Sequence, residues 1–356
     1  GNDYGLCSSK CRKDYNRSMI LITGANGWLG LNLVDAINKG RTEKWGQKPD
    51  KIRAFILHET DKHRLLEIAP DIEIVEGDLN DEKDVKQFLK GAENAYLFHT
   101  AGIIHPKRIS EFYRVNRDAT QNLLKASSKA IIKRAVVVSS NSPCGCNSSK
   151  DHVFDESSQY HPYMNYGRSK MEMEIICNEF VKKGDLDLVI IRAPWFYGPF
   201  QPYRQKLFFE MIRNGKAPIV GSGENRRSMS YTENLVQGLV LAAVTQKALG
   251  KTYWIADERS YTMNEVVDTI EAVLEGEFGQ KCDHGRLRLP SWVSTFAEKT
   301  DALIQWFGYY NQKIHVLSEM NKTIACSVSQ AQKELGYFPE YSLKKGIQIS
   351  LAEIYN

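Results

Sequence analysis

A glycine-rich turn between a buried strand and a helix is the feature that most constrains this chain. The run Met19-Ile-Leu-Ile-Thr23 is almost wholly apolar, as is typical of a strand buried on both faces of a parallel sheet. It leads into Gly24-Ala-Asn-Gly-Trp-Leu-Gly30, after which apolar residues recur at helical spacing. Gly24 permits a tight turn, Gly27 lets the backbone approach a pyrophosphate, and Gly30 allows close packing of helix on strand. This context predicts a dinucleotide-binding site, with a glycine-rich turn that holds no ligand as the alternative.

Strand and helix patterns alternate from this turn to about residue 192. Further apolar runs lie at 52–57, 72–75, 95–99, 135–138 and 188–191, with helical patterns between most of them. Such alternation predicts an α/β fold, a Rossmann-type doubly wound parallel sheet with right-handed crossovers. From Pro194 onward, loops rich in Pro, Gly and aromatic residues separate helical patterns at 205–213, 232–245, 263–274 and 290–307. These segments predict a smaller C-terminal substrate-binding lobe over the carboxyl edge of the sheet.

The length of 356 residues suits about two domains. We expect residues 18–193 to form the dinucleotide-binding Rossmann domain, to which segments near 228–256 return. Residues 194–227 and 257–356 are expected to form most of the substrate-binding lobe. Residues 1–17 are polar and lack periodicity, so we expect a disordered leader.

Composition excludes several classes of protein. A hydrophobic fraction of 42% is that of a globular protein, which excludes wholesale disorder. The formal net charge of +4 is too small for this length to indicate nucleic-acid or membrane-surface binding through bulk charge. No apolar run approaches the roughly 20 residues that span a bilayer, and no secretory signal is recognisable. We therefore expect a soluble, cytoplasmic protein with a small-molecule substrate and no nucleic-acid partner.

The cysteines do not form a metal-binding pattern. The chain has seven cysteines, an odd number, and no C-x-x-C pair. A zinc site needs four ligands at suitable spacings, and no convincing set is present, so no metal is predicted. We expect reduced thiols, with a redox or metal role for Cys144 and Cys146 as the alternative.

Further motifs follow the glycine turn in order. They are Gly77-Asp78-Leu79, His99-Thr-Ala-Gly102, Val115-Asn116, Val138-Ser139-Ser140, Tyr166-Gly-Arg-Ser-Lys170 and Arg192-Ala-Pro194-Trp-Phe-Tyr197. With the G-x-x-G-x-x-G spacing of the turn, this series resembles the extended branch of the short-chain dehydrogenase/reductase superfamily. That branch contains nucleotide-sugar epimerases and dehydratases and 3β-hydroxysteroid dehydrogenase-like enzymes. The resemblance covers nearly all of residues 19–354.

The resemblance implies which residues bind a dinucleotide cofactor, NAD or NADP. In the turn they are Gly24, Asn26, Gly27, Trp28, Leu29 and Gly30. Beyond it they are Asp78 and Leu79 at adenine, Thr100, Ala101 and Gly102 after the fourth strand, Asn116 in the following helix, Val138 and Ser139 on the fifth strand, and Pro194 near nicotinamide. Tyr166 and Lys170 complete this set. Ser139 could equally be a plain strand-end residue.

Tyr166 and Lys170 carry the predicted chemistry. Residues four apart lie on one helix face, so Lys170 can sit beside the Tyr166 ring. A nearby ammonium favours the phenolate, so we expect Lys170 to lower the pKa of Tyr166 from about 10. Tyr166 could then exchange a proton with an alcohol or carbonyl oxygen while hydride moves to or from nicotinamide. By resemblance Ser140 is the catalytic serine, with Ser142 as a second candidate. A surface pair is the alternative for an isolated Tyr-x-x-x-Lys.

The end of the second predicted strand bears on the choice of cofactor. Members that prefer NAD usually carry an acidic residue there, whereas this chain has Ile56 or Leu57. The missing carboxylate removes repulsion against a 2′-phosphate, and His58, Lys62 and Arg64 could supply positive charge. The arginine often used by NADP-dependent relatives is also missing. These observations favour NADP over NAD by a narrow margin.

The sequence says less about the substrate. Arg227 matches a position at which nucleotide-sugar enzymes bind the substrate diphosphate, and a guanidinium suits phosphate oxygens. A surface arginine pair, Arg226 and Arg227, is the alternative. An aromatic cluster could line an apolar pocket or pack the two lobes together; its members are Trp195, Phe196, Tyr197, Phe200 and Tyr203.

The leading hypothesis is an NAD(P)-dependent oxidoreductase that interconverts a secondary alcohol and a ketone with Ser140, Tyr166 and Lys170. The alternative is a nucleotide-sugar epimerase with tightly held NAD. Dehydration is disfavoured because the dehydratases place an acidic pair where this chain has Asn141-Ser142-Pro143. A non-catalytic dinucleotide-binding sensor is less favoured because the three catalytic residues are intact. The resemblance also implies a homodimer formed through helices at about 109–129 and 162–182.

Overall fold

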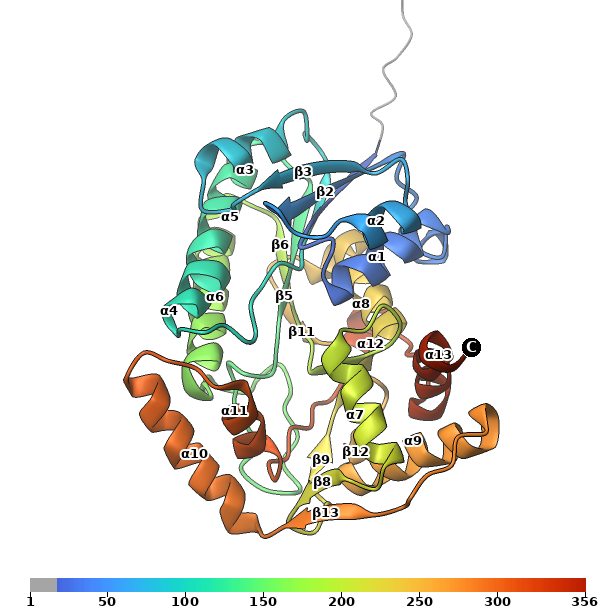
Figure 1. Cartoon of the computed structure of the whole chain (residues 1–356). Helices are drawn as coiled ribbons and strands as arrows, with labels where there is room; N and C mark the ends of the chain where they lie inside the picture. The colour runs from blue at the N-terminus through green and yellow to red at the C-terminus, as the bar shows by residue number, and fades with distance from the viewer. Residues whose placement is uncertain (1–17) are drawn as a thin grey trace, which may run out of the picture.

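The computed structural model describes residues 18–356, and its centre is a seven-stranded parallel sheet (Figure 1). The strand order is β11-β6-β5-β4-β1-β2-β3. The strands are β1 (Met19–Thr23), β2 (Lys51–Leu57), β3 (Glu73–Gly77), β4 (Tyr96–His99), β5 (Arg134–Ser139), β6 (Leu188–Arg192) and β11 (Thr252–Trp254). The order reverses between β1 and β4, where doubly wound sheets bind ligands at the carboxyl ends of the strands. The predicted α/β fold is confirmed.

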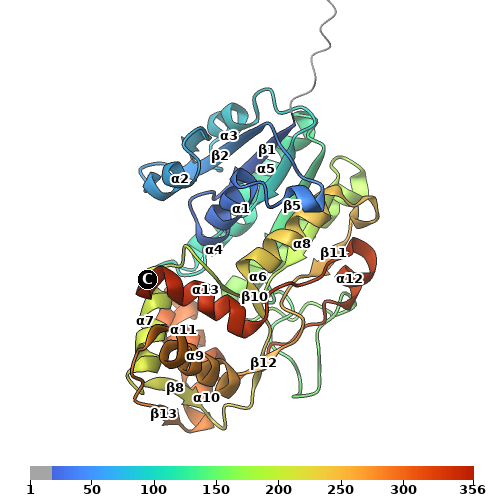
Figure 2. The ribbon, with the colours of Figure 1, turned by 90° about the vertical axis from the view of Figure 1, so that its right-hand side faces the viewer.

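Helices cover both faces of the sheet (Figures 1 and 2). One face carries α3 (Glu82–Leu89), α5 (Ala119–Lys129) and α6 (Met164–Lys183), and the other carries α1 (Trp28–Asn38), α8 (Thr232–Val244) and α12 (Ser329–Leu335). Every residue of β5 is buried, because its side chains point alternately into the two helical layers. Because helices pack on both faces of the sheet, the sequences of the central strands are continuous apolar runs.

A second lobe lies beyond the carboxyl edge of the sheet (Figure 1). It contains α7 (Tyr203–Arg213), β8 (Ala217–Val220), α9 (Met263–Phe278), β13 (Arg286–Leu289), α10 (Ser291–Trp306), α11 (Gln312–Glu319) and α13 (Leu343–Tyr355). Strands β8 and β13 pair in parallel. Two further pairs join β7 (Trp195–Tyr197) to β10 (Met229–Tyr231) and β9 (Arg226–Arg227) to β12 (Tyr261–Thr262). A separate apolar core joins α7, β8, α9 and α13 of this lobe.

Several elements differ from the sequence expectation. The helix expected at 109–129 is α4 (Ser110–Phe112), a π-helix η2 (Tyr113–Asp118) and then α5. Strand β11 lies in the segment near 228–256 that is predicted to return to the first domain, and it pairs with β6 at the edge of the main sheet. The remaining elements are α2 (His63–Ile68) and the short helices η1 (Glu43–Trp45) and η3 (Gln246–Ala248). The boundaries between the two lobes stay a prediction, and the expected leader at 1–17 lies outside the described residues.

Across residues 18–356, no helix is both long and apolar enough to cross a membrane. Over the same range no group of three or more His, Cys, Asp or Glu residues is placed to hold a metal ion. Cys144 and Cys146 are free thiols. Burial raises their pKa values, to about 11 for Cys144 and about 12 for Cys146, so both are protonated at neutral pH.

Candidate active site

The glycine turn lies between β1 and α1 and leaves no space for side chains. Gly24 has a φ of +64°, and a Cβ atom there would come within 2.7 Å of Ala101 Cα. A Cβ atom on Gly30 would lie 2.2 Å from the carbonyl oxygen of Gly24. Gly27 precedes α1 without a capping side chain, and the first helical turn contains no acidic residue. The N–H groups at this helix end are therefore available to an anion.

Buried His99 joins the ends of β1 and β4. Its Nδ1 lies 2.7 Å from Thr23 Oγ1, and its Nε2 lies 2.7 Å from Thr120 Oγ1. The Thr120 hydroxyl donates to the Asn116 carbonyl oxygen, so it accepts from His99 Nε2–H, and Thr23 donates to Nδ1. Burial, aided by the charge of Lys170, lowers the pKa of His99 to about 3. The neutral imidazole fixes the glycine turn against the strand that leads to Thr100, Ala101 and Gly102.

Ser140 follows β5 and is held by Ser142. The Ser140 hydroxyl donates to Ser142 Oγ at 2.9 Å and accepts from the Ser142 backbone N–H at 3.1 Å. The neighbouring Ser139 hydroxyl oxygen is buried without a hydrogen-bond partner. Because an unpartnered buried hydroxyl is costly, a ligand that bonds to Ser139 would be favoured.

Lys170 and Tyr166 lie one turn apart on α6. Lys170 Nζ donates to the Val138 carbonyl oxygen at 3.1 Å. A Cβ atom on Gly102 would lie 3.6 Å from this ammonium. The Tyr166 hydroxyl interacts with Ser140. The structure therefore brings the three predicted catalytic residues together at the carboxyl end of β5, beside the loop after β4.

The pKa of Tyr166 is shifted in the direction opposite to the prediction. Burial raises it to about 12; the hydrogen bond with Ser140 lowers it, and the Glu319 carboxylate adds to the rise. Burial also lowers the pKa of Lys170 to about 8, against the attraction of Glu174. The prediction that Lys170 lowers the pKa of Tyr166 is wrong in this structure, because burial of the phenol dominates. Tyr166 is a protonated phenol at neutral pH.

Asn116 lies in the π-helix η2 and forms hydrogen bonds with two segments next to the site. Its Oδ1 accepts from the Ile103 N–H at 3.0 Å, and its Nδ2 donates to Ser169 Oγ at 3.1 Å. The widened turn of a π-helix is frequent at functional sites. Asn116 ties the loop after β4 to α6, and its contact with a cofactor stays a prediction.

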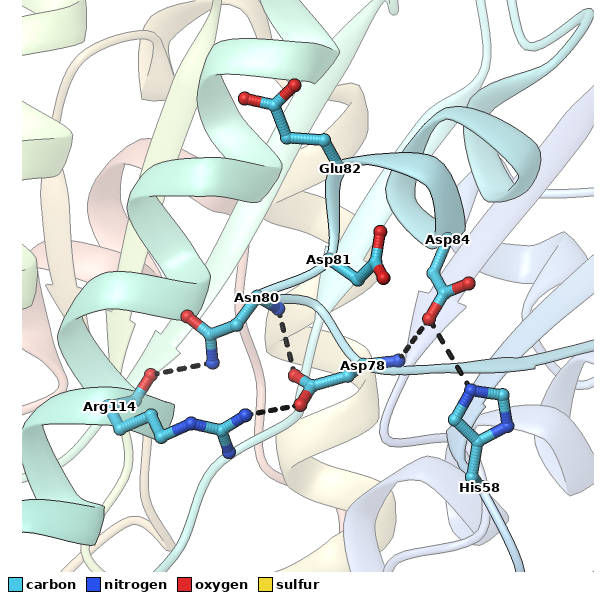
Figure 3. Close-up of a pocket in the computed structure, with 7 residues that line it drawn as sticks. All are labelled: His58, Asp78, Asn80, Asp81, Glu82, Asp84 and Arg114. Atoms are coloured by element: carbon cyan, nitrogen blue, oxygen red, sulfur yellow. Dashed lines mark hydrogen bonds and ion pairs between the residues drawn. The ribbon is translucent and has the colours of Figure 1, made fainter.

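An open pocket of about 450 Å³ lies beyond β2 and β3 (Figure 3). Its lining residues are His58, Asp78, Asn80, Asp81, Glu82, Asp84 and Arg114. Asp78 Oδ2 accepts from Arg114 at 2.5 Å, and Oδ1 accepts from the Asn80 N–H at 2.9 Å. Burial tends to raise the pKa of Asp78, but these bonds hold it below its ordinary value. Carboxylates outnumber basic groups here, so the pocket is acidic.

Each basic side chain that the sequence offered to a 2′-phosphate has a carboxylate partner. The pairs are His58 with Asp84 at 3.5 Å, Lys62 with Glu76, and Arg64 with Glu353 at 2.8 Å. Leu57, one of the two residues at the place of the ribose-binding acid, is exposed, whereas Ile56 is buried. These side chains would have to leave their partners to bind a phosphate.

The segment after β6 is fastened to the N-terminal turn of α1. The Pro199 carbonyl oxygen accepts from Trp28 Nε1 and from Asn32 Nδ2, both at 2.9 Å. The Trp28 ring meets Phe196 edge-on at a centroid distance of 6.3 Å. Asn26 Nδ2 donates to Thr60 Oγ1 at 3.0 Å, which ties the loop after β2 to the turn. Both neighbouring segments are thus anchored at the glycine turn.

Of the two roles expected for the aromatic cluster, lining a pocket or packing, Tyr197 has the packing role. It is fully buried, and its hydroxyl donates to Asp257 Oδ2 at 2.5 Å. Asp257 Oδ1 accepts from the Tyr231 N–H and from Asn234 Nδ2, each at 2.9 Å. Burial raises the pKa of Asp257 to about 6. Tyr197 therefore has no surface left for a substrate, whereas Trp195 is only partly buried.

Two arginines of the second lobe are candidates for binding an anion. Arg227 Nη2 donates to the Glu319 carbonyl oxygen, and its Nε is buried without a partner. Arg204 on α7 has no carboxylate partner among residues 18–356, and its side chain is exposed. Burial lowers the pKa of His105, and the positive charge of Arg204 adds to this effect. His105 Nδ1 lies 2.8 Å from the Tyr310 hydroxyl oxygen. Arg204 carries no motif, so the sequence does not single it out.

Aromatic side chains form a continuous row from His105 through Tyr310 and Phe112 to Tyr166. Phe112 lies between the Tyr310 and Tyr166 rings, with centroid distances of 5.3 Å and 5.7 Å. Burial of these rings excludes water from one side of the Tyr166 phenol. A partly buried phenol one helical turn from the Lys170 ammonium, near a free helix N-terminus, is suited to proton exchange next to a dinucleotide.

A family model described as the NAD dependent epimerase/dehydratase family matches residues 20–256. The chain belongs to this family. The expected resemblance to extended short-chain dehydrogenases/reductases is confirmed, and the protein is an NAD-dependent enzyme of the epimerase/dehydratase type. The glycine turn, the free end of α1 and the unpartnered Ser139 hydroxyl fit a dinucleotide.

Similar proteins include members with different activities. Uncharacterized protein y4nL of Sinorhizobium fredii is 48% identical over 339 residues, which are 94% of this chain and 95% of that protein. An N-acetyl-alpha-D-glucosaminyl-diphospho-ditrans,octacis-undecaprenol 4-epimerase of Escherichia coli O157:H7 is 27% identical over 257 residues, 72% of each chain. A 3 beta-hydroxysteroid dehydrogenase/Delta 5-->4-isomerase of Mycobacterium tuberculosis is 27% identical over 352 residues, 92% of this chain and 88% of that protein.

The fold is shared with solved enzyme structures. The UDP-glucuronic acid 4-epimerase from Bacillus cereus in complex with NAD superposes with a TM-score of 0.72 at 20% identity. The match covers 94% of this chain and 98% of that chain. The likeness establishes the common architecture of the two lobes.

Proposed function

We propose that the protein is an epimerase that inverts a secondary alcohol on a sugar carried by a diphosphate, with NAD kept through the whole cycle. The observation that carries the proposal is the meeting of Ser140, Tyr166 and Lys170 beside the glycine turn. The Escherichia coli relative, named as a 4-epimerase of a sugar diphosphate, supports this choice. Net alcohol oxidation with the same three residues is the second candidate, which the Mycobacterium tuberculosis relative favours.

The protein's own residues would orient the substrate and move its proton. Ser140 would hydrogen-bond the reacting oxygen and keep it near the Tyr166 phenol. The phenolate form of Tyr166, which is the minor form at neutral pH, would take the hydroxyl proton as the carbonyl forms, and the resulting phenol would return that proton when the hydroxyl is restored. Lys170 would bind a ribose hydroxyl and stabilise the phenolate during the transfer. NAD, when bound, supplies the hydride acceptor for the first half and the donor for the second.

Retention of the cofactor separates an epimerase from a net dehydrogenase, because epimerisation returns the hydride to the same substrate. The Pro199 carbonyl oxygen accepts from both Trp28 and Asn32, which fastens the segment after β6 to α1. Opening this side of the turn would break both hydrogen bonds. This arrangement supports a cofactor that stays bound between turnovers.

We infer NAD rather than NADP, against the narrow preference of the sequence. The pocket beyond β2 and β3 is acidic and would repel a 2′-phosphate. The three basic candidates are already paired with carboxylates, so recruiting them would expose unpaired acids. The 2′-hydroxyl of NAD carries no charge, so the acidic pocket does not repel it and no ion pair has to be broken to bind it.

Arg204 and Arg227 would bind the substrate diphosphate. Arg204 has no carboxylate partner among the described residues, and Arg227 has a buried Nε without an acceptor. Guanidinium groups bind phosphate oxygens through two parallel hydrogen bonds. Ser142 and Trp195 would contact the sugar.

The test uses two sugar diphosphates that differ in their carrier, UDP-N-acetylglucosamine and a short-chain polyprenyl-diphospho-N-acetylglucosamine. Purified protein is incubated with each, and the products are analysed by NMR. We expect the C4 epimer of one of them without accumulation of NADH, and no product with Tyr166→Phe. Formation of NADH in equal amount to a keto product, or no turnover of either compound, would contradict the proposal.

A homodimer stays a proposal, as does the cytoplasmic location. Leu123 and Leu124 on α5 are fully buried in the protein's own core, whereas Ile175 on α6 is exposed. The contact between subunits would therefore rest on the outer side of α6 rather than on these leucines. Sedimentation at micromolar concentration tests it, and a monomer would contradict it.

A further inference from the structure

Helix α10 presents its apolar side to solvent and its polar side to the protein. In a surface helix of a soluble protein the apolar stripe faces the core. In α10 the buried positions are instead small or polar, namely Ser294, Ala297, Asp301 and Gln305. The outer side and the residues that follow hold large apolar side chains, Trp292, Phe296, Leu303, Trp306, Phe307 and Tyr309. We call these six residues the α10 apolar face.

The exposure of this face is extensive. The exposed fractions are 66% for Trp292 and Phe296, 57% for Leu303 and 77% for Trp306. Positions 292, 296, 299, 303 and 306 follow one another along a single side of a helix. The helix lies at the outer edge of the second lobe, at the lower left of Figure 1. Contiguous exposed aromatic surface of this kind marks an interaction site.

The polar inner side fixes the rotation of α10. Asp301 Oδ2 bonds to His315 Nδ1 at 2.7 Å, and Ser294 Oγ donates to the Leu317 carbonyl oxygen at 2.8 Å. Gln305 Oε1 accepts from Asn165 Nδ2 at 2.9 Å, next to the catalytic tyrosine. Rotating the helix to bury its aromatic residues would break all three contacts. The apolar face is therefore held outward by specific bonds.

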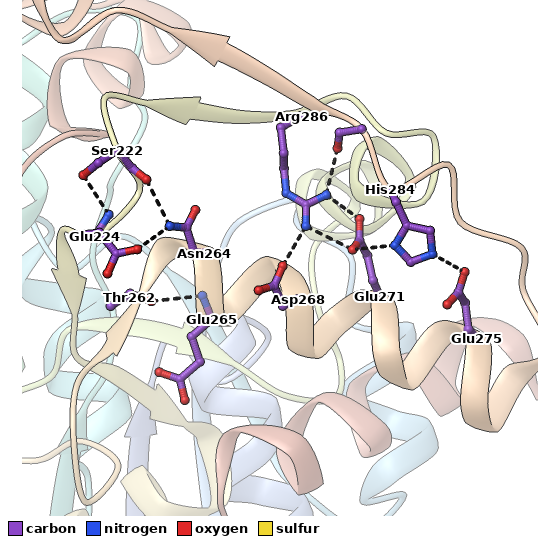
Figure 4. A network of polar contacts seen from close by, with 11 residues as sticks. Ser222, Glu224, Thr262, Asn264, Glu265, Asp268, Glu271, Glu275, His284 and Arg286 are labelled. Atoms are coloured by element: carbon purple, nitrogen blue, oxygen red, sulfur yellow. Dashed lines mark hydrogen bonds and ion pairs between the residues drawn. The ribbon is translucent and has the colours of Figure 1, made fainter.

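The strand that leads into α10 is anchored as well (Figure 4). Arg286 on β13 donates to Asp268 at 2.8 Å and to Glu271 at 2.6 Å, both on α9. His284 bonds to Glu275 at 2.7 Å on the same helix. These contacts attach the start of the segment firmly to the second lobe.

The exposed charges around the α10 apolar face are mostly basic. Within residues 287–316 the exposed charged side chains are Arg288, Lys299 and Lys313. The two acidic residues of this range are neutralised, since Asp301 is buried against His315 and Glu298 pairs with Lys322 at 2.8 Å. The loop after β4 adds exposed Lys107 and Arg108, and the Arg108 guanidinium lies 5.1 Å from the centroid of the Tyr309 ring. A carboxylate outside this range, that of Glu111, accepts from the backbone N–H groups of Lys107 and Arg108.

We propose that the α10 apolar face inserts into the interface of a bilayer that contains anionic phospholipid. Tryptophan and phenylalanine partition to the headgroup boundary, and surrounding basic residues attract anionic headgroups. A second copy of the chain fits less well, because a two-fold contact centred on this stripe would bring the two Lys299 side chains together. The proposal goes beyond the proposed function and does not depend on which reaction the site catalyses.

Vesicle flotation with the full chain tests the proposal. The probes are vesicles of phosphatidylcholine alone and vesicles in which about a third of the lipid is phosphatidylglycerol. We expect at least about tenfold stronger binding to the anionic vesicles, weaker binding at high salt, and a blue shift of tryptophan emission on binding.

The decisive variant is Trp292→Ser/Phe296→Ser/Trp306→Ser. It should lose about tenfold or more in vesicle binding, with an unchanged far-UV circular dichroism spectrum. Ile131→Ser/Phe338→Ser is the matched control, because both side chains are 66% exposed outside α10, and it should bind like wild type. Lys299→Glu provides a second test that leaves the aromatic residues intact, and it should weaken binding to anionic vesicles severalfold.

Three outcomes would overturn the proposal. They are no binding of the wild type to anionic vesicles, equal binding of the triple variant and the wild type, and equal binding of the wild type to the two kinds of vesicle. A dimer that the triple variant converts to monomer, without vesicle binding, would assign the α10 apolar face to a second copy of the chain instead.

Discussion

Lys170 Nζ donates to the carbonyl oxygen of Val138 at 3.1 Å, which ties α6 to the strand that ends beside Ser140. The same ammonium lies next to Gly102 in the loop after β4, where a Cβ atom would come within 3.6 Å of it. One side chain thus fixes the distances among three segments that meet at the carboxyl edge of the sheet. In the proposed reaction this contact sets the position of the Tyr166 phenol relative to the cofactor.

Replacement of Tyr166 by phenylalanine should remove the proton transfer while keeping the ring packed against Phe112. We expect kcat to fall by about 10² to 10⁴, as is usual for loss of a general acid–base group. The amount of cofactor bound should stay at the wild-type level, because only the hydroxyl is removed. A kcat within a few-fold of wild type would exclude Tyr166 as the proton-transfer group.

The buried ion pair between Glu174 and Arg192 should be worth far more than a surface pair. Its two hydrogen bonds measure 3.0 Å and 2.7 Å, and both side chains are buried. Glu174→Gln leaves a buried guanidinium without its counter-charge, so we expect a loss of about 3 kcal/mol in the free energy of unfolding. Glu172→Gln breaks the partly exposed pair with Arg117 and should cost less than about 1 kcal/mol. Urea denaturation measures both, and equal losses would contradict the prediction.

Gly30→Ala should disrupt the glycine turn, because its Cβ atom would lie 2.2 Å from the Gly24 carbonyl oxygen. We expect loss of cofactor binding together with a lower melting temperature. Gly276→Ala in α9 is the matched control, since nothing lies within 4 Å of its added Cβ atom. That variant should gain up to about 1 kcal/mol from higher helix propensity. Normal cofactor binding by Gly30→Ala would refute the proposed role of the turn.

Cofactor-depleted protein should bind NAD at least about tenfold more tightly than NADP, because the pocket beyond β2 and β3 is acidic. Glu76→Gln releases Lys62 from its partner and should narrow this ratio severalfold. Titration calorimetry with both dinucleotides provides the two Kd values. Tighter binding of NADP by the wild type would restore the preference drawn from the sequence.

His99 makes stability depend on pH in a defined direction. Its pKa is about 3 in the folded protein and about 6.5 when unfolded, so the unfolded chain takes up a proton first as pH falls. The stabilisation is complete above pH 6.5 and is lost as pH decreases, by about 2 kcal/mol at pH 5. His99→Asn should flatten the pH dependence of the free energy of unfolding in this range. Exposed His63→Gln should leave it as in wild type, and equal slopes for all three proteins would contradict the assignment.

The Rossmann half could be predicted from sequence because its strands are buried on both faces. Ala135 to Val138 in β5 are apolar without interruption, since each of them faces a helical layer. The spacing of Tyr166 and Lys170 likewise locates the site, because residues four apart share one side of a helix. The direction of the Tyr166 pKa shift could not be predicted, since it depends on how deeply the fold buries the phenol.

The second lobe is less predictable because its elements are short and depend on tertiary contacts. The run Arg286-Leu-Arg-Leu289 in β13 is a strand only because it pairs with β8. The pattern at 290–307 predicts an amphipathic helix, and α10 is one. Which side faces inward depends on the bonds of Asp301 and Gln305 to residues distant in sequence. A net charge of +4 likewise does not reveal a local basic surface.

The central claim is an epimerase cycle that retains NAD, and mass spectrometry of the small molecules released from freshly purified, denatured protein tests it most directly. We predict NAD, in a ratio close to one molecule per chain, and no NADP. A site that is empty after purification and exchanges NADPH or NADH freely would contradict the account and indicate a net reductase or dehydrogenase.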